Sequence, residues 1–402
     1  MNFLLATLLM AQMQVFFGRD NLPHKLAVTI SRATYSLDMA FHQVYEPEVV
    51  DSILSVYNRG VKVRIITEHN YFNRTEALRN AGIIVVDEFN DRNATDHIMH
   101  DKFMVIDYWD SDTSNDVVWN GSYNASNYIH ADNAVVVQSH SLAKIFEAEF
   151  NQMWGDTTYM PDPTDARTGR DKQDTAPFHT VYVNGTRIDV YFSPQDSPIN
   201  FLIALAESSK TSIDFNIFYF THMSLASAMA NRLDNGVRIR GVYEHSGMYY
   251  SRRTFELLQS HGAQVYEDST RPRYYYLHHK FMVVDDSIVE TGSMNWTVSG
   301  NSSNDENIMI IYNSRIADAY EREFIRRFRE AGGVVRVAES SWNHASPLCA
   351  SSTVFRGIVR FNRQGVKIVD ATGRLVGVSR SLTFNGSHLS PGIYFAIYGN
   401  SK

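Results

Sequence analysis

The stretch HDKFMVID at residues 100–107 recurs as HHKFMVVD at residues 278–285. Each copy is followed by a Gly-Ser-x-Asn tetrapeptide, at residues 121–124 and 292–295. Two copies of one unit in the same order account for most of the chain. The internal repeat is therefore stronger evidence for the fold than the secondary-structure propensity of any single segment.

Helix and strand patterns alternate in the segments before each repeated stretch. SLDMAF at 36–41 is echoed by SIDFNI at 212–217. Apolar residues at helical spacing across 49–57 stop at Gly60, and strand-like alternation starts at Val61. This order predicts an α/β fold of two repeats, each a mixed sheet flanked by helices, packed with pseudo-twofold symmetry.

Changes in composition mark the expected domain boundaries. A short apolar run that ends at a small residue predicts a signal peptide at residues 1–11. The repeats are expected at 12–154 and 177–333, joined by a polar, proline-containing linker at 155–176. Short alternating strands separated by turns predict a small all-β region at 334–402.

Composition narrows the function classes. The formal net charge is −7, which gives no overall attraction to polyanions, although a local basic groove stays open. No stretch reaches the roughly 18–20 apolar residues of a membrane helix, so no transmembrane helix is expected. The lone Cys349 excludes an internal disulfide and a cysteine-based metal cluster. An Asn-Gly turn in residues 181–186 predicts a hairpin.

The repeated motif carries chemistry. On a strand, residues two apart face the same side, so His100 and Lys102 point into one pocket, as do His278 and Lys280. If the repeats pack face to face, one cleft holds two imidazoles and two ammoniums. We expect further hydrogen-bond donors there from Ser122, Asn124, Ser293 and Asn295. Such a cleft suits a phosphodiester, because fixed cations stabilise charge on phosphoryl oxygens without a metal ion.

The two histidines can divide the reaction into two steps. One attacks phosphorus and the other protonates the leaving oxygen, through a phosphohistidine intermediate. An acidic residue on the second ring nitrogen would fix the tautomer of each imidazole. Asp132 and Glu306, at equivalent places in the repeats, are the candidates. No cofactor and no metal is expected, and His279 is assigned no role.

The paired motifs resemble the HKD motifs of the phospholipase D superfamily over roughly residues 12–330. The resemblance implies the predicted fold, the phosphohistidine route and independence from metal. It implies that His100 is the nucleophile and His278 the general acid. It also implies that Asp107 and Asp285 hydrogen-bond within their own halves rather than act in the chemistry.

The C-terminal residues resemble the β-sandwich sorting or anchoring domains of exported bacterial proteins, on the strings at 366–374 and 389–395. With the apolar N-terminus, this resemblance predicts a secreted or extracytoplasmic protein.

Several functions compete. The leading hypothesis is hydrolysis of a phospholipid headgroup, with peripheral membrane contact left open. The runner-up is a secreted metal-independent endonuclease, with phosphate contacts from Lys62, Arg271 and Arg273 and stacking by Tyr274–Tyr276. A phosphatidyl transferase is third. A non-catalytic phosphate or nucleic-acid binding protein would be expected to lose a motif residue, and none is missing. The sequence predicts no oligomeric state.

Overall fold

The computed structural model describes residues 13–88, 97–128, 130–269 and 275–335. It also describes five short strands, at 358–360, 366–370, 375–378, 383–385 and 394–398. The chain divides into two compact units, with the division between Val334 and Val335 in the sequence, so both repeats belong to the first unit. The expected signal peptide at residues 1–11 lies outside the described residues.

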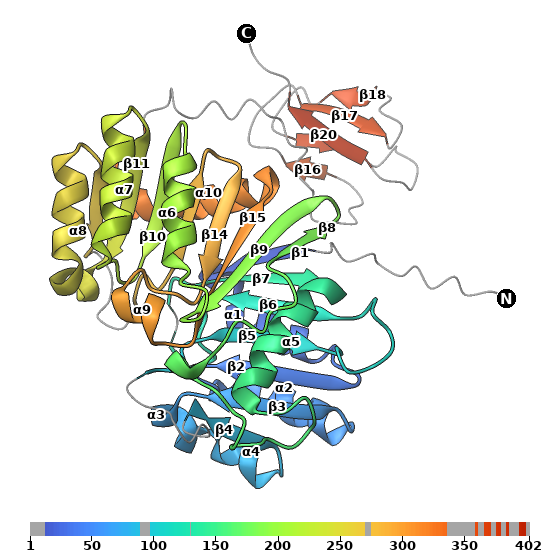
Figure 1. The fold of residues 1–402 in the computed structure, drawn as a ribbon. Helices are drawn as coiled ribbons and strands as arrows, with labels where there is room; N and C mark the ends of the chain where they lie inside the picture. Colours follow the sequence, from blue (N-terminus) through green and yellow to red (C-terminus); the bar gives the residue numbers. More distant parts are fainter. Residues whose placement is uncertain are drawn as a thin grey trace. The chain divides into compact units, whose positions relative to one another are not determined.

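The first repeat forms a seven-stranded sheet (Figure 1). Its strands lie in the order β1 (Met13–Phe17), β7 (Asn133–Gln138), β6 (Val117–Gly121), β5 (Lys102–Ile106), β2 (Ser36–Phe41), β3 (Lys62–Thr67) and β4 (Ile84–Asp87). β2, β3 and β4 are parallel, whereas β5 pairs antiparallel with β2 and β6. The motif strand β5 is therefore central in a mixed sheet, and all its residues are buried.

The second repeat forms an eight-stranded sheet of the same design. Its order is β12 (Gln264–Asp268), β11 (Arg238–Glu244), β10 (Ser212–Ile217), β13 (Lys280–Val284), β14 (Ile288–Gly292), β15 (Glu306–Tyr312), β9 (Thr186–Ser193) and β8 (Thr180–Val183). The first six strands match β4, β3, β2, β5, β6 and β7 in order. The predicted α/β fold of two mixed-sheet repeats is confirmed.

The two sheets differ at one edge. β1, from the N-terminal segment, is the edge strand next to β7 in the first sheet. In the second sheet the hairpin β8–β9 occupies the equivalent edge, next to β15. Asn184 and Gly185 have φ values of 49° and 76°. Positive φ at both central residues is the mark of a type I′ turn, so the predicted Asn-Gly hairpin is confirmed.

Helix α2 (Pro47–Asn58) shows how local sequence sets an element. The proline at its first position loses no hydrogen bond there, and the Glu46 carboxylate accepts from the Val49 N–H (2.9 Å). Val49 and Ile53 are buried on one face. The chain turns at Gly60, whose φ of +95° suits glycine.

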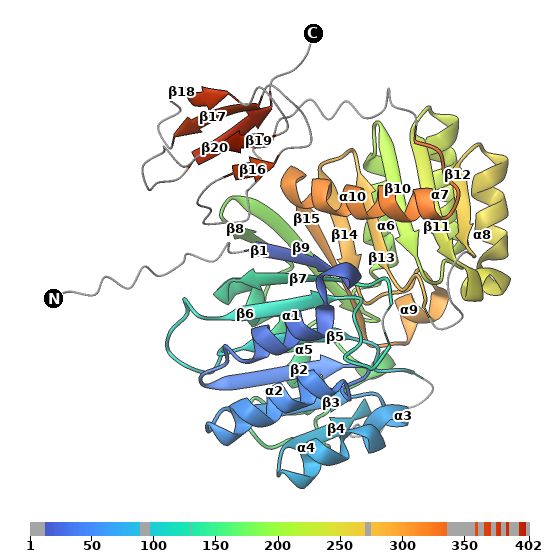
Figure 2. The same ribbon diagram turned by 180° about the vertical axis from the view of Figure 1, so that it is seen from behind.

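Helices cover both faces of each sheet (Figures 1 and 2). On the first sheet, α1 (Leu22–Ile30) and α2 lie on one face and α5 (His140–Trp154) on the other. On the second, α6 (Ile199–Ser208), α7 (Met223–Asp234) and α8 (Met248–Ser260) lie opposite α10 (Ser314–Glu330). Each repeat has its own hydrophobic core. The shorter helices are α3 (His69–Phe72), α4 (Glu76–Asn80) and α9 (Val298–Ser302).

The halves also pack against each other. The ring of Phe17 lies 5.2 Å from that of Tyr320 between centroids, edge to face. Thr291 Oγ1 donates to Asn133 Oδ1 across the boundary (2.8 Å). These buried contacts fix the two motif strands relative to each other.

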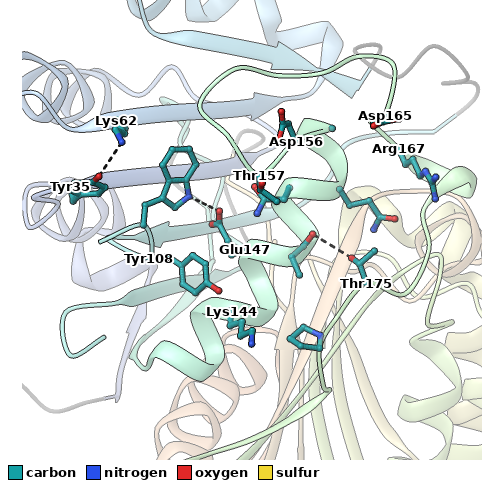
Figure 3. Close-up of a pocket in the computed structure, with 16 residues that line it drawn as sticks. Tyr35, Lys62, Tyr108, Lys144, Glu147, Asp156, Thr157, Asp165, Arg167 and Thr175 are labelled. Carbon is teal, nitrogen blue, oxygen red and sulfur yellow. Dashed lines mark hydrogen bonds between the residues drawn. The ribbon is translucent and has the colours of Figure 1, made fainter. Parts of the chain in front are cut away.

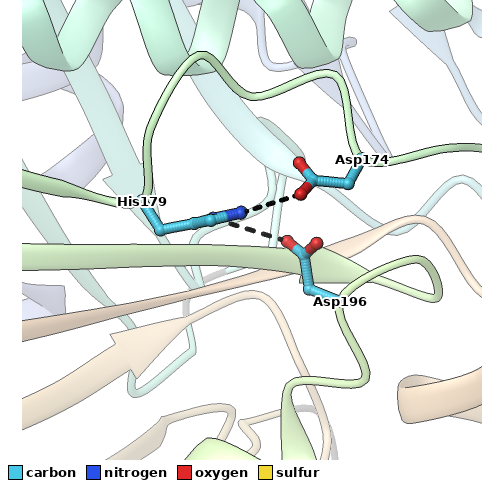
Figure 4. Close-up of side chains that lie close together, drawn as sticks. All are labelled: Asp174, His179 and Asp196. Carbon is cyan, nitrogen blue, oxygen red and sulfur yellow. Dashed lines mark hydrogen bonds and ion pairs between the residues drawn. The ribbon is translucent and has the colours of Figure 1, made fainter.

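The segment expected as a linker, 155–176, is tied down at its end by His179 (Figure 4). The ring donates from Nδ1 to the Val190 carbonyl (2.9 Å), and Nε2 lies 3.2 Å from Asp174 Oδ2. Asp196 Oδ2 lies 3.8 Å from Nδ1. Burial opposes a charge on this ring, but these acceptors outweigh it and raise the pKa of His179.

The sequence predicts short strands in the C-terminal unit, and its described strands form only antiparallel pairs. β16 (Ile358–Arg360) pairs with β19 (Thr383–Asn385), and β17 (Val366–Asp370) lies between β18 (Leu375–Val378) and β20 (Tyr394–Tyr398). A sorting or anchoring role for this unit stays a prediction. Among the described residues, no helix is long and apolar enough to cross a membrane.

Candidate active site

Each motif histidine is held by a carboxylate from the other repeat. His100 Nδ1 lies 2.8 Å from Glu306 Oε2, and His278 Nδ1 lies 2.7 Å from Asp132 Oδ1. The second ring nitrogen, Nε2, is therefore left for a ligand. The structure brings both predicted carboxylates to the histidines, and it shows that the two pairs cross the boundary between the halves.

The backbone crosses the same boundary. The N–H of His100 donates to the carbonyl of Asp305 (2.9 Å), and the N–H of His278 donates to that of Ala131 (3.0 Å). Each histidine is thus fixed at its main chain and at its ring by two successive residues of the opposite half.

The two lysines bring positive charge into a buried place. Lys102 and Lys280 are fully buried, and each ammonium donates to the carbonyl of the histidine two residues before it. Burial lowers the pKa of Lys102 to about 8. Burial, with the charge of Lys102, lowers the pKa of Lys280 to about 7. An anion between the ammoniums would relieve their repulsion, so the site favours a bound phosphate.

The histidines themselves are poor bases in this environment. Burial, followed by the charge of Lys280, lowers the pKa of His278 to about 3. Burial and the charge of Lys102 also lower the pKa of His100 well below its ordinary value. Both imidazoles are therefore neutral near pH 7, which leaves a nitrogen lone pair available for nucleophilic attack.

The supporting carboxylates differ. Burial raises the pKa of Glu306 well above its usual range, although Lys102 opposes the shift. Burial acts the same way on Asp132, but the charge of His278 and their hydrogen bond outweigh it and hold the pKa of Asp132 below its usual range. The environment of Asp132 therefore favours the ionised carboxylate beside His278, whereas that of Glu306 disfavours it beside His100.

The motif serines lie behind the carboxylates, not in the cleft as expected from the sequence. Ser122 Oγ donates to Asp132 Oδ1 (2.7 Å) and accepts from the Asn133 N–H (3.0 Å). Ser293 Oγ accepts from the Asn307 N–H (2.9 Å) and hydrogen-bonds Glu306. Both serine hydroxyls hydrogen-bond to neighbouring residues of the protein. The two serines therefore support Asp132 and Glu306, the carboxylates that hold the histidines.

The glycine before each serine has a steric reason. A Cβ at Gly121 or Gly292 would lie 2.3 Å from the carbonyl oxygen of Asn133 or Asn307. Only glycine allows β6 to approach β7, which begins directly after Asp132, and β14 to approach β15, which begins at Glu306, this closely.

The motif asparagines lie beside the cleft. Asn295 Oδ1 accepts from the Tyr219 N–H (3.3 Å). Asn124 Oδ1 is buried without a hydrogen-bond partner among the described residues. Donation from their amide groups to a ligand stays a prediction.

Asp107 and Asp285 lie at the far ends of the motif strands. Asp107 Oδ1 accepts from the N–H groups of Tyr35 (2.8 Å) and Ser36 (3.1 Å). Asp285 Oδ1 accepts from those of Thr211 (2.7 Å) and Ser212 (3.0 Å). A five-residue strand spans roughly 17 Å, so both lie outside the cleft and clamp their own halves, as the resemblance implies.

Asp285→Ala is expected to lower the free energy of unfolding by about 2 kcal/mol, because several charge-assisted hydrogen bonds are lost. Although partial burial opposes it, bonding to Thr211 and its neighbours lowers the pKa of Asp285 below 3.8. This contribution is present above the unfolded-state pKa and disappears as pH falls through the folded-state pKa. Urea unfolding at pH 7 and pH 2.5 measures it. The exposed neighbour Asp286→Ala is the control, and an equal loss in both variants would contradict the clamp.

Aromatic rings that the sequence analysis did not select line both sides of the cleft. The rings of His42 and His100 lie 4.9 Å apart between centroids, and those of Phe218 and His278 also 4.9 Å. His130 lies 5.8 Å from His278. His42 and Phe218 each follow a repeated strand, β2 and β10, at the same position. This equivalence was the sequence signal that could have found them.

The tyrosine run before the second motif divides in the structure. The ring of Tyr276 contacts His130 and Phe218 near the cleft. The hydroxyl of Tyr275 instead accepts from Arg327 (3.0 Å). Tyr274, Arg271 and Arg273 lie outside the described residues.

A pocket of about 530 Å³ lies next to the cleft, lined by Tyr219, Tyr250, Val298 and Arg170 among others. A larger pocket of about 900 Å³ contains Tyr35 and Trp109 (Figure 3). Tyr35 precedes β2, whereas His42 follows it, so the larger pocket lies at the opposite end of the sheet from the histidines. Lys62, a suggested phosphate contact, lines this distant pocket.

The α/β unit is duplicated, and its two His-x-Lys motifs meet in one cleft. Each imidazole is held by a carboxylate of the other copy. These features define a class of two-repeat proteins whose shared site suits a phosphodiester. Residues 26–154 and 202–328 match the family model described as cardiolipin synthase, PLD-like domain. The chain belongs to this family, within the phospholipase D superfamily.

Individual relatives agree with this assignment. A mitochondrial cardiolipin hydrolase of Xenopus tropicalis is 37% identical over 135 residues, which are 34% of this chain and 63% of that protein. A phospholipase D of Rickettsia prowazekii is 24% identical over 142 residues, 35% of this chain and 68% of that protein. The chain thus spans less than two thirds of the length of the cardiolipin hydrolase.

A solved structure has the same fold. The phosphatidylserine synthase of Haemophilus influenzae Rd KW20 superposes with a TM-score of 0.60 at 14% identity, over 80% of this chain and 86% of that one.

Proposed function

We propose that this protein hydrolyses phosphodiester bonds through a phosphohistidine intermediate, and that its substrate is a phospholipid. The proposal rests on one observation: two neutral imidazoles, each oriented by a carboxylate of the other repeat, stand beside two buried ammoniums.

In the first step, Nε2 of one histidine forms a bond to phosphorus while the bond to the leaving oxygen breaks. The other histidine, which is protonated once the phosphate anion occupies the site, gives its Nε2 proton to that oxygen. In the second step the latter histidine takes a proton from water, whose oxygen attacks phosphorus and releases the first histidine. Lys102 and Lys280 would stabilise the charge on the non-bridging oxygens in both steps.

The resemblance to the phospholipase D superfamily implies that His100 is the nucleophile. The carboxylates favour the reverse assignment, because ionised Asp132 accepts the Nδ1 proton of His278 and leaves its Nε2 unprotonated. Trapping of the intermediate decides between the two.

Exposed apolar side chains beside the cleft favour a lipid. Tyr250 and Val298 line the adjacent pocket and are 65% and 63% exposed, and Tyr128, stacked on His130, is 55% exposed. Tyrosine suits a lipid–water boundary, since its ring is apolar and its hydroxyl polar. The relatives named as cardiolipin hydrolase and phospholipase D point the same way. An extracytoplasmic location is proposed on the apolar run at residues 1–11 and on the resemblance of the C-terminal residues to sorting or anchoring domains.

The test offers cardiolipin vesicles, phosphatidylcholine vesicles, single-stranded DNA and bis-p-nitrophenyl phosphate in parallel, with EDTA present. We expect cleavage of bis-p-nitrophenyl phosphate and of at least one lipid. The double variant His100→Asn/His278→Asn is the control for contaminating activity. Cleavage of DNA without lipid cleavage would make the protein a nuclease. Binding of DNA or lipid with no cleavage of any substrate would make it a binding protein.

A further inference from the structure

The chain between the repeats enters the boundary between the halves. Gly169 and Lys172 of this segment are buried. The N–H of Gly169 donates to Asp305 Oδ1 (2.8 Å). The segment expected to be a simple linker therefore contacts a residue of the second repeat that adjoins Glu306.

Lys172 joins three parts of the chain at one ammonium. Its Nζ lies 2.5 Å from Glu149 Oε1 on α5 and 3.0 Å from Asp305 Oδ1. The side chains of Lys172 and Asp305 are fully buried and that of Glu149 is nearly so. Burial opposes the charge, but the two carboxylates hold the pKa of Lys172 above its ordinary value. The Lys172 ammonium therefore stays charged near pH 7, whereas burial raises the pKa of Glu149 to about 8.

Asp305 passes this restraint to His100. Its carbonyl accepts the His100 N–H (2.9 Å), and its own N–H donates to Ile98 (3.0 Å). The next residue, Glu306, holds the His100 ring at 2.8 Å. Asp305 therefore lies between the Lys172 ion pair and the residues that hold the main chain and the ring of His100.

The second histidine is held differently: Glu323 contacts His279, the residue after His278, at 3.2 Å. The residue equivalent to Asp305 is Ala131, whose carbonyl accepts the His278 N–H (3.0 Å) but whose side chain has no polar group. The equivalent of Glu149 is Glu323, which pairs with Arg327 of its own helix (2.7 Å). The linker thus supplies a cation, Lys172, on the His100 side of the active site. The linker supplies no equivalent cation on the His278 side among the described residues.

We propose that Lys172 is a positioning residue for His100, which makes the linker part of the support of the active site. The effect on turnover rests on the proposed function, whereas the effect on the His100–Glu306 hydrogen bond does not.

The decisive variant is Lys172→Met with Asp305→Asn. One positive and one negative charge are removed together, so the formal charge of the cluster is unchanged. Glu149 loses its lysine partner, but burial raises its pKa to about 8, so it can take up a proton. Lys172→Arg, which keeps the charge, and Lys144→Met, an exposed lysine on α5, are the controls. A misplacement of about 1 Å costs roughly 100-fold, so we expect kcat on bis-p-nitrophenyl phosphate to fall by about that factor with KM little changed. Both controls should stay within about fivefold of wild type.

Proton NMR gives a readout besides activity. The low-field proton shared by His100 and Glu306, assigned by its loss in His100→Asn, should shift or broaden in the double variant. The proton shared by His278 and Asp132 should stay in place. Wild-type kcat in the folded double variant, or an unchanged His100 resonance, would overturn the proposal. A wild-type protein without turnover would contradict the proposed function and leave the NMR test intact.

Discussion

His100→Asn and His278→Asn are each expected to lower kcat on bis-p-nitrophenyl phosphate by about 10⁴-fold or more, because one variant loses the nucleophile and the other the proton carrier. Asparagine keeps a polar group that can reach the opposing carboxylate. The melting temperature should therefore change little. Steady-state kinetics and thermal unfolding measure the two effects. His140→Asn is the control, since His140 is partly exposed at the start of α5 and pairs with the buried Asp116, outside the cleft.

The same variants assign the nucleophile. p-Nitrophenolate leaves without a proton, so a variant that lacks only the general acid should still form the phosphohistidine and then stall. Mass spectrometry under alkaline denaturing conditions detects the phosphoryl adduct. An adduct in His278→Asn and none in His100→Asn would support His100 as nucleophile, and the opposite pattern would assign His278. Substantial turnover by either variant would remove that histidine from the mechanism.

The fold could be predicted from the sequence because each element of the repeat is seen twice. β2 and β10, or β5 and β13, show the same pattern in each copy, so an ambiguity in one segment is resolved by the other. The Asn184-Gly185 hairpin was predictable because its turn chemistry is local. Contacts inside one repeat, such as the clamp by Asp285, belong to the same category.

Contacts across the boundary could not be predicted in this way. The repeat places Asp132 and Glu306 at equivalent positions, but which histidine each one meets depends on how the halves dock. His279, assigned no role from sequence, lies 3.2 Å from Asn133 Nδ2 across that boundary and 3.2 Å from Glu323. Its counterpart Asp101 accepts from Asn307 Nδ2 (2.6 Å). The variable residue of each motif therefore joins the halves.

The motif serines show a second limit. Ser122 and Ser293 were expected to bind the ligand, because a hydroxyl near a phosphate site is a natural donor. In the structure, those hydroxyls instead accept hydrogen bonds from the backbone N–H groups of Asn133 and Asn307, on the adjacent strands β7 and β15. Sequence spacing identifies such residues as members of the site but does not show which way they face.

The two carboxylates should respond very differently to neutralisation. Asp132→Asn is expected to lower kcat by about 10³- to 10⁴-fold, since an ionised carboxylate that holds the tautomer and stabilises the imidazolium is lost. Glu306→Gln should cost no more than about tenfold. Burial raises the pKa of Glu306 well above its usual range, so a neutral amide of the same shape resembles the protonated acid it replaces.

The comparison depends on both variants staying folded, which circular dichroism and thermal unfolding establish. Glu290→Gln is the matched control, because Glu290 is also fully buried and burial also raises its pKa, but it lies on β14 away from the histidines. Equal losses in Asp132→Asn and Glu306→Gln would show that the two carboxylates share one ionisation state. The larger loss in Glu306→Gln would reverse the roles inferred from their environments. The difference between the variants therefore tests whether two copies of one motif have acquired different electrostatics in the cleft that they share.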